Sequence, residues 1–487
     1  MAHARALARL QALPPMLAAG AITAAVALLG SLAPSARPAA SPATVSPRAA
    51  RLRVFVHDPS GAPLHARVRV VEIGGDARRA AVARDGEAAL TLAPGRWRVT
   101  VSRGPERSID RRVVALRSGR EATVEARLRR VLDPGEHVPC DLHVHAAPSA
   151  DSEVSLDARV RSLAAEGIRF AVATDHNHVT DYRAAAEAAG LRDLGTAPGV
   201  EVTTWEPSFG HFNAWPLAVD RADRRGGAPA FSGTSPAALF DALHALGPDV
   251  VVQINHPRLD DGIGYLDRVG FDPARGTTEG KASFAADAVE VWNGYELRDL
   301  DALDANLRDW MALVGAGHRL VATGSSDSHD LHRHPAGYPR TYVRVPGGRV
   351  DDPARVAAAL RAGHAFVSSG PLLEVRANGA GPGEVARHDG VVRLEVTART
   401  PAWMRLDRLE VWLGGARIRD EALPPAPARD GARAWTYRSS LEVHEPTFVV
   451  VRVRGPATPA LGARPVPPVA FGNPVWLRVE GAQRVRR

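Results

Sequence analysis

The stretch that decides the fold is residues 141–176, DLHVHAAPSADSEVSLDARVRSLAAEGIRFAVATDH. Ser155 is a favourable helix cap, apolar residues then recur every three to four positions, and Gly167 is a typical helix end. Residues 168–174 are almost uninterruptedly apolar, which is typical of a parallel strand buried on both faces. The stretch therefore predicts a strand, a helix and a second strand in succession.

The same alternation continues towards the C-terminus. Helix starts are predicted at Ser235-Pro236 and Asp352-Pro353, a helical face at residues 300–314, and buried strands at residues 249–254, 288–292 and 320–323. Repeated strand–helix units over about 230 residues are typical of an α/β fold built as a (β/α) barrel.

Histidines and carboxylates gather at the predicted C-terminal ends of these strands, the face on which barrel enzymes build their active sites. Two i, i+2 pairs, in HVH and DSH, each point to one side of an extended chain. Histidine and carboxylate ligands suit zinc, manganese or iron(II). One such residue alone is usually structural, but two spaced pairs with strand-end residues between them indicate a metal site. The candidate metal ligands are His143, His145, Asp151, His176, Glu201, His211, His256, Asp327 and His329.

The motif series DLHVH, TDHN, GVE, NHP and SDSH resembles the polymerase and histidinol phosphatase (PHP) superfamily. Residues 141–182 are most similar to its CehA/McbA-type metallohydrolases, although the loop AAPSADSEVS lacks the Ser-Asp-Gly often found there. The resemblance covers residues 139–372 and implies a distorted seven-stranded (β/α) barrel with two to three divalent metal ions. The ligand groups it implies are His143, His145, Glu201 and Asp327; Asp151, His176 and His329; and Glu201, as a bridge, with His211 and His256.

Two further modules are expected to flank the barrel. Residues 51–130 contain short alternating strands, with a hairpin expected from residues 89–92 and 97–101, and predict a β-sandwich. Within them, VFVHDPSGAPLHARVRV followed by LAPGRWRVTV resembles the carboxypeptidase regulatory-like domain. Residues 373–480 alternate in the same way and predict a second sandwich.

The N-terminal 36 residues have the features of a targeting segment. Arg5 and Arg9 precede an apolar stretch that ends in small residues, which is typical of a secretory signal peptide. The long apolar stretch also fits an uncleaved anchor, and residues 37–50 form a Pro/Ala/Ser linker. We therefore expect a periplasmic or secreted protein, or one attached to the inner membrane through this segment alone.

The composition of the chain argues against nucleic-acid binding and against a fold held by disulfides or cysteine-bound zinc. The chain has 487 residues and a net charge of +7, but its basic residues are spread along the sequence, which argues against a dedicated nucleic-acid surface. Aromatic residues are sparse, and a single cysteine, Cys140, excludes an intrachain disulfide and a cysteine-rich zinc module.

The sequence thus predicts an exported multinuclear metal-dependent hydrolase acting on a small-molecule phosphoester through a metal-bridging hydroxide. Glu201 would be catalytic as the bridging ligand, and Arg258, next to the NHP motif, could clamp phosphate. One alternative is a carbamate or carboxylic ester hydrolase with the same metal site. Another is a non-enzymatic surface-binding protein that works through its β-sandwiches.

Overall fold

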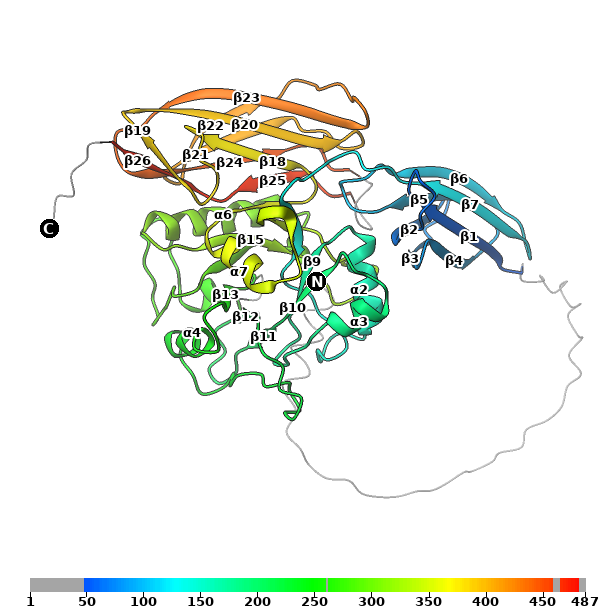
Figure 1. Ribbon diagram of the computed structural model, residues 1–487, viewed down its shortest axis with the longest axis horizontal. Helices are drawn as coiled ribbons and strands as arrows, with labels where there is room; N and C mark the ends of the chain where they lie inside the picture. Colours follow the sequence, from blue (N-terminus) through cyan, green and yellow to red (C-terminus); the bar gives the residue numbers. More distant parts are fainter. Residues whose placement is uncertain (1–47, 260–261, 459–464, 481–487) are drawn as a thin grey trace, which may run out of the picture. The chain divides into compact units, whose positions relative to one another are not determined.

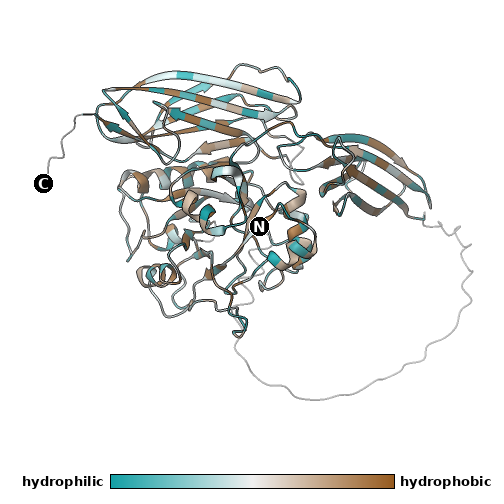
Figure 2. Ribbon diagram, viewed as in Figure 1, coloured by the Kyte–Doolittle hydropathy of each residue, from teal (hydrophilic) through white to brown (hydrophobic). Residues whose placement is uncertain are grey.

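The computed structural model describes residues 48–259, 262–458 and 465–480 (Figure 1). Within these residues the chain forms twenty-six β-strands and six α-helices, so strands dominate the fold. Many strands alternate hydrophobic and polar residues, as the colour bands of Figure 2 show, and therefore bury one face.

The N-terminal strands form two sheets around one core. One sheet has the order β4-β1-β7, and the other has the order β3-β2-β5-β6. Their bounds are β1 (Ala50–His57), β2 (Ala66–Glu72), β3 (Arg78–Ala83), β4 (Glu87–Leu92), β5 (Gly95–Ser102), β6 (Asp110–Leu116) and β7 (Glu121–Arg127). In β1 every second residue from Ala50 to Val56 is buried, as the sequence pattern predicts. The expected β-sandwich over residues 51–130 fits this arrangement.

The hairpin expected within this module is wrong. β4 pairs with β1, whereas β5 pairs with β2 and β6 in the other sheet. The short connection at Pro94 therefore carries the chain from one sheet to the other. Leu90 on β4 and Trp97 on β5 belong to the same core, one from each sheet. Each strand therefore buries its apolar face although the two strands do not pair with each other.

Two mixed sheets form the central region. The first begins with the order β10-β9-β8-β16-β17, and the second has the order β11-β12-β13-β14-β15. The strands of the first are β8 (His137–Asp141), β9 (Phe170–Ala173), β10 (Gly195–Pro198), β16 (Arg340–Arg344) and β17 (Ala365–Ser368). Those of the second are β11 (Val200–Thr203), β12 (His211–Trp215), β13 (Val251–Ile254), β14 (Ala288–Asn293) and β15 (Val321–Ser325).

Six helices connect these strands, and the predicted caps are confirmed for three of them. Ser155, Ser235 and Asp352 each accept a hydrogen bond from a backbone N–H in the first turn of α2, α4 and α7. The helices are α2 (Leu156–Ala165), α3 (Arg183–Ala188), α4 (Pro236–His244), α5 (Tyr265–Arg268), α6 (Leu300–Gly315) and α7 (Pro353–Arg361).

The predicted α/β class with a distorted seven-stranded (β/α) barrel is wrong. Such a barrel needs parallel strands joined by helices, but β11 and β12 follow each other as an antiparallel pair, and β16 is antiparallel to both β8 and β17. The two central sheets meet through isolated bridges at His176–Glu201 and Val144–Ser328. Buried apolar runs identify strands but do not encode their direction, which explains the error.

The C-terminal strands form the second sandwich, as expected. One sheet has the order β18-β20-β23, and the facing strands continue the first central sheet, because β17 pairs with β25. The strands are β18 (Leu372–Ala377), β19 (Val385–His388), β20 (Val391–Pro401), β21 (Arg408–Leu413), β22 (Ala416–Ala422), β23 (Ala432–Glu442), β24 (Thr447–Arg454), β25 (Val469–Gly472) and β26 (Val475–Val479).

The predicted targeting segment, residues 1–36, and most of the linker at 37–50 lie outside the described residues. In the part of the chain that is described, no helix has the length and apolar character needed to span a bilayer.

Candidate metal centre

The two histidines of the HVH pair lie just beyond β8, and both are fully buried. The His143 Nδ1 atom is 3.1 Å from Glu290 Oε1, and the His145 Nδ1 atom is 3.1 Å from Ser149 Oγ. Their Nε2 atoms have no hydrogen-bond partner although they are buried. Each ring is thus oriented through Nδ1 and presents Nε2 to the interior, as metal-ligating imidazoles do.

Asp327 reaches this position from the loop after β15. Asp141 at the end of β8 fixes that loop by accepting hydrogen bonds from the backbone N–H groups of Ser326 and Gly337, at 3.0 and 2.7 Å. Asp327 Oδ1 then lies 3.3 Å from His143 Nε2 and 3.1 Å from His145 Nε2. Local sequence and a buried carboxylate together bring the two predicted i, i+2 pairs into contact.

Glu201 on β11 lies at the middle of the cluster. The side chain is 1% exposed, and its two oxygens lie 3.0 to 3.4 Å from ring nitrogens of five histidines. These histidines are His143, His145, His176, His211 and His256. One carboxylate that faces five imidazoles from both oxygens has the geometry required of a bridging ligand.

Asp151 joins the cluster from the loop before α2. Its Oδ2 atom lies 3.2 Å from His176 Nε2 and 3.0 Å from His329 Nε2. The His145 ring stacks on the His329 ring with centroids 4.0 Å apart, so this group adjoins the first. The unusual loop sequence around Asp151 therefore still delivers its carboxylate to the expected place.

All nine predicted metal-ligand residues are brought together. They form four overlapping groups, and within each group one nitrogen or oxygen atom per residue lies within 4.8 Å of the others. The donor set is imidazole and carboxylate, which fits zinc, manganese or iron. Buried imidazole nitrogens without hydrogen-bond partners would be costly unless another group satisfied them. These residues therefore fit divalent metal binding.

The charges of the cluster are strongly coupled. Burial by itself would raise the pKa of Glu201, but the neighbouring His176 and His143 rings hold that pKa well below its usual value. Burial lowers the pKa of His329, but Asp151 and Asp327 outweigh it and raise the pKa to about 9. The carboxylates are thus kept ionised, as cation ligands must be.

Two ligand positions have unusual backbone conformations. His256 and Asp327 adopt φ values of 24° and 48°, which non-glycine residues seldom adopt. The His256 N–H donates to Glu290 Oε2 at 2.9 Å, and the Asp327 N–H donates to the His143 carbonyl at 2.8 Å. The strained backbone at these two positions is thus held by hydrogen bonds to Glu290 and His143, which both lie at the candidate metal centre. Strained backbone of this kind is common at functional sites.

Sequence reasoning missed the residues that support the ligands. Glu290, on β14, is fully buried and orients both His143 and the His256 backbone. Asn255 donates to Glu201 Oε1 at 2.9 Å. The signal for Glu290 was present in the sequence, since it is an acidic residue inside the apolar run 288–292.

Arg258, the predicted phosphate clamp, is engaged elsewhere. Its Nε and Nη1 atoms donate to Asp309 and Asp267, at 2.8 and 3.0 Å, and Nη2 donates to the Phe271 carbonyl at 2.8 Å. A phosphate would have to displace these partners. The clamp role stays a prediction, and the contacts indicate a stabilising role. Cys140 is buried in an apolar cluster, and burial raises the pKa of its thiol.

No protein-family model matches the chain, and none of the curated proteins does either. Among solved structures, a two-domain protein from Bacteroides vulgatus containing a predicted PHP-like metal-dependent phosphoesterase is 17% identical, with a TM-score of 0.37, covering 71% of this chain and 96% of that one.

An amidohydrolase from Chromobacterium violaceum is 18% identical, with a TM-score of 0.27, covering 39% of this chain and 87% of that one. A protein from Bifidobacterium adolescentis described as a metal-dependent phosphoesterase is 16% identical, with a TM-score of 0.28. The match covers 45% of this chain and 95% of that one. Similarity at these levels carries no argument about function, so the functional conclusion depends on the site itself.

Proposed function

We propose that the protein is a metal-dependent hydrolase of the PHP type, related to the CehA/McbA metallohydrolases, with a multinuclear centre. One observation carries the proposal: the buried Glu201 carboxylate faces ring nitrogens of five histidines at 3.0 to 3.4 Å. A single ion cannot use all nine donor residues of the cluster, because tetrahedral and octahedral sites hold four to six ligands. Nine donor residues, Glu201 included, support two to three ions.

The ligand groups are those that the family resemblance implies, although by proximity His256 groups with His143 and Asp327, and His211 groups with His176 and Glu201. Divalent ions bound there would supply Lewis acidity and would lower the pKa of a coordinated water towards about 7. The chain's own residues prepare the site: Glu290 orients the His143 ring, and Ser149 orients the His145 ring. The proposed groups, whose members contact one another in pairs, are His143, His145, Glu201 and Asp327; Asp151, His176 and His329; and Glu201, His211 and His256.

We propose a phosphoester as the substrate. A cluster of adjacent dications is suited to neutralising the nonbridging oxygens of a phosphate during in-line displacement. Tyr295 is half exposed, and its hydroxyl lies 3.2 Å from His329 Nδ1, so it can reach a substrate bound at the centre. Carbamate and carboxylic esters are the competing substrates, since the same centre could hydrolyse them.

The test couples metal analysis with a substrate panel. Purified protein, reconstituted with zinc or manganese, is assayed on p-nitrophenyl phosphate, bis(p-nitrophenyl) phosphate and p-nitrophenyl acetate. We expect phosphoester turnover that His176→Ala abolishes and His178→Ala leaves intact, because His178 shares the loop but not the cluster. Turnover of the acetate alone would overturn the phosphoesterase proposal, and turnover that survives His176→Ala would overturn the site.

Export is a separate part of the proposal, supported by the basic and apolar N-terminal segment. A fusion of residues 1–50 to a reporter active only in the periplasm should be active. A reporter that stays inactive and cytoplasmic would overturn export without affecting the enzymatic proposal.

A further inference from the structure

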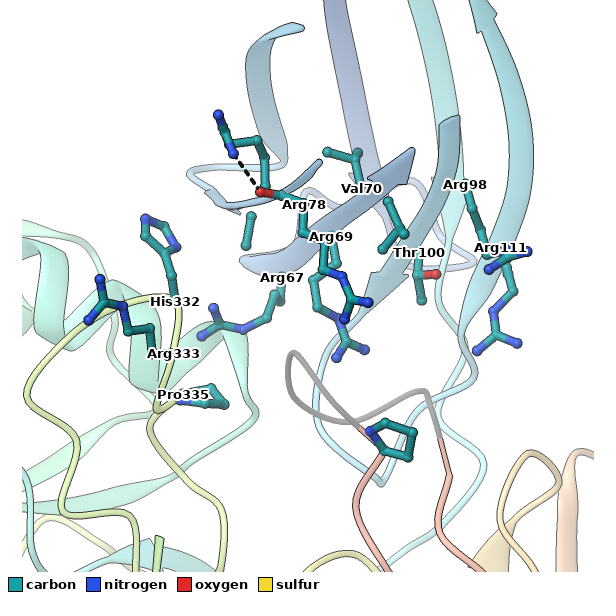
Figure 3. A pocket seen from close by; sticks show the side chains of 14 residues that line it. Arg67, Arg69, Val70, Arg78, Arg98, Thr100, Arg111, His332, Arg333 and Pro335 are labelled. Carbon is teal, nitrogen blue, oxygen red and sulfur yellow. Dashed lines mark hydrogen bonds between the residues drawn. The ribbon is translucent and has the colours of Figure 1, made fainter. Parts of the chain in front are cut away.

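One face of the N-terminal sheet β3-β2-β5-β6 is unusually rich in arginine. The strand register places Arg69 opposite Thr100, and Thr100 opposite Arg111; the next row pairs Val71 with Arg98. These residues lie on the outer face of the sheet. The other face of β2 contributes Val68 and Val70 to the apolar core. Figure 3 shows Arg98 and Arg111 near each other on neighbouring strands.

This face lines a cavity of about 560 Å³. His332 and Arg333, from the loop that follows the metal-site residue His329, form part of the opposite wall (Figure 3). No aspartate or glutamate is among the described residues that line the cavity. Its arginines are Arg67, Arg69, Arg78, Arg79, Arg98, Arg111 and Arg333.

Arg67, one of these arginines, is paired within the chain. It is 3% exposed, forms an ion pair with the buried Glu166, and donates from Nη1 to the Leu331 carbonyl at 2.7 Å. By contrast, in the described part of the chain neither Arg98 nor Arg111 forms a salt bridge. Arg98 and Arg111 therefore present guanidinium groups that no carboxylate of the described residues pairs with, in a cavity whose wall is rich in arginine.

Burial and neighbouring guanidinium groups also disfavour the positive charge of Arg69, which lies on this face. Burial lowers the pKa of Arg69 to about 10, and the neighbouring Arg67 and Arg111 guanidinium groups lower it as well, while Glu166 acts in the opposite direction. Like charges gathered in a concave, partly desolvated space repel one another more strongly than on an open surface. A bound anion would relieve this repulsion.

We propose that this cavity is a binding site for a small ligand carrying several linked phosphate groups. Arginine forks match phosphate oxygens in bidentate geometry, and several guanidinium groups on adjacent strands can contact more than one phosphate at once. A cavity of this size holds a small molecule rather than a folded partner. None of its lining residues belongs to the candidate metal centre, so the site does not depend on the proposed function.

The probe is sodium tripolyphosphate, titrated calorimetrically into the full-length protein, with orthophosphate and citrate as comparison ligands. We expect saturable binding of tripolyphosphate that weakens as NaCl is raised from 50 to 500 mM, because salt screens exposed charges. Orthophosphate and citrate should each bind at least about tenfold more weakly. Equal binding of orthophosphate would overturn the linked-phosphate assignment, and equal binding of citrate would overturn the preference for phosphate.

Variants locate the site. Arg98→Ala combined with Arg111→Ala should weaken tripolyphosphate binding at least about tenfold, the scale of one charge-assisted hydrogen bond. The matched control is Arg127→Ala, an exposed arginine on the other sheet of the same module, which should change nothing. Glu201→Gln, which alters the metal centre, should leave this binding unchanged. Wild-type affinity in the double variant, or loss in Glu201→Gln instead, would overturn the proposal.

Discussion

Glu201 and Glu410 are both withdrawn from solvent, with exposures of 1% and 0%, but they meet different partners. Glu410, on β21, is paired with Arg452, and also lies 3.2 Å from Arg417 and 3.4 Å from Arg454. Glu201 meets imidazoles instead, and two of their buried Nε2 atoms lack a hydrogen-bond partner.

The difference separates a structural carboxylate from a functional one. Guanidinium groups are permanently charged and satisfy a buried carboxylate completely, so the Glu410 cluster needs nothing further. Imidazoles, unlike guanidinium groups, can lose a proton and offer the lone pair to a metal ion, so the Glu201 cluster can exchange protons for bound cations. The first cluster should therefore control stability, and the second should control metal binding and turnover.

The largest expected effect is on stability at Glu410. Glu410→Gln should lower the free energy of unfolding by about 3 kcal/mol, because the buried Arg452 guanidinium then keeps only Asp304, among the described residues, as a counter-charge. Chemical denaturation of the wild-type and variant proteins measures this. Metal content per folded chain should not change, and a variant that keeps its stability but loses metal would break the comparison.

Glu201→Gln should give the opposite result. It keeps the side-chain volume but removes the charge that separates the bound dications, so we expect hydrolysis to fall at least about 10²-fold and metal content to fall with it. The fold should survive, because the neighbouring core is aliphatic and aromatic. Normal turnover and metal content in this variant would show that Glu201 does not bridge ions.

Glu290 tests whether the supporting residues matter. Glu290→Gln weakens the acceptor for His143 Nδ1 and for the His256 N–H, so metal affinity should fall about 10- to 100-fold. Competition with a chromogenic chelator measures the affinity. The defect should be rescued by excess metal, unlike that of Glu201→Gln. An affinity equal to that of the wild type would reduce Glu290 to a packing residue.

The smallest effect is expected at Arg258. Arg258→Ala removes contacts with Asp267 and Asp309 and should cost about 1–2 kcal/mol of stability, while phosphoester and acetate-ester turnover fall equally or not at all. Arg275→Ala, an arginine paired with a carboxylate at the surface, is the matched control. A selective loss of phosphoester turnover would support the phosphate-clamp prediction instead.

Local features of the fold could be predicted because their causes are local. The caps at Ser155, Ser235 and Asp352 depend on one side chain and the next turn of backbone. The convergence of the candidate ligands could be anticipated in part, since His176 and His256 follow strands as expected, whereas His211 begins β12 and Glu201 lies within β11. Their spacing in the sequence therefore carried spatial information.

Strand direction and pairing could not be predicted in the same way. β11 and β12 turn back on each other, and β16 inserts antiparallel between β8 and β17, because of pairings between distant segments. One partner of Arg258 is likewise distant in the chain, since Asp309 lies on α6. Such choices depend on the whole set of competing contacts rather than on any one stretch.

Metal content tests the central claim most directly. The protein is reconstituted with zinc or manganese, dialysed free of unbound ions and analysed by inductively coupled plasma mass spectrometry. The account predicts two to three equivalents of metal per chain in the wild-type protein and in Glu410→Gln, with a clear loss in Glu201→Gln. A content below about half an equivalent in folded wild-type protein would contradict it, because the nine converging side chains would then hold no ions.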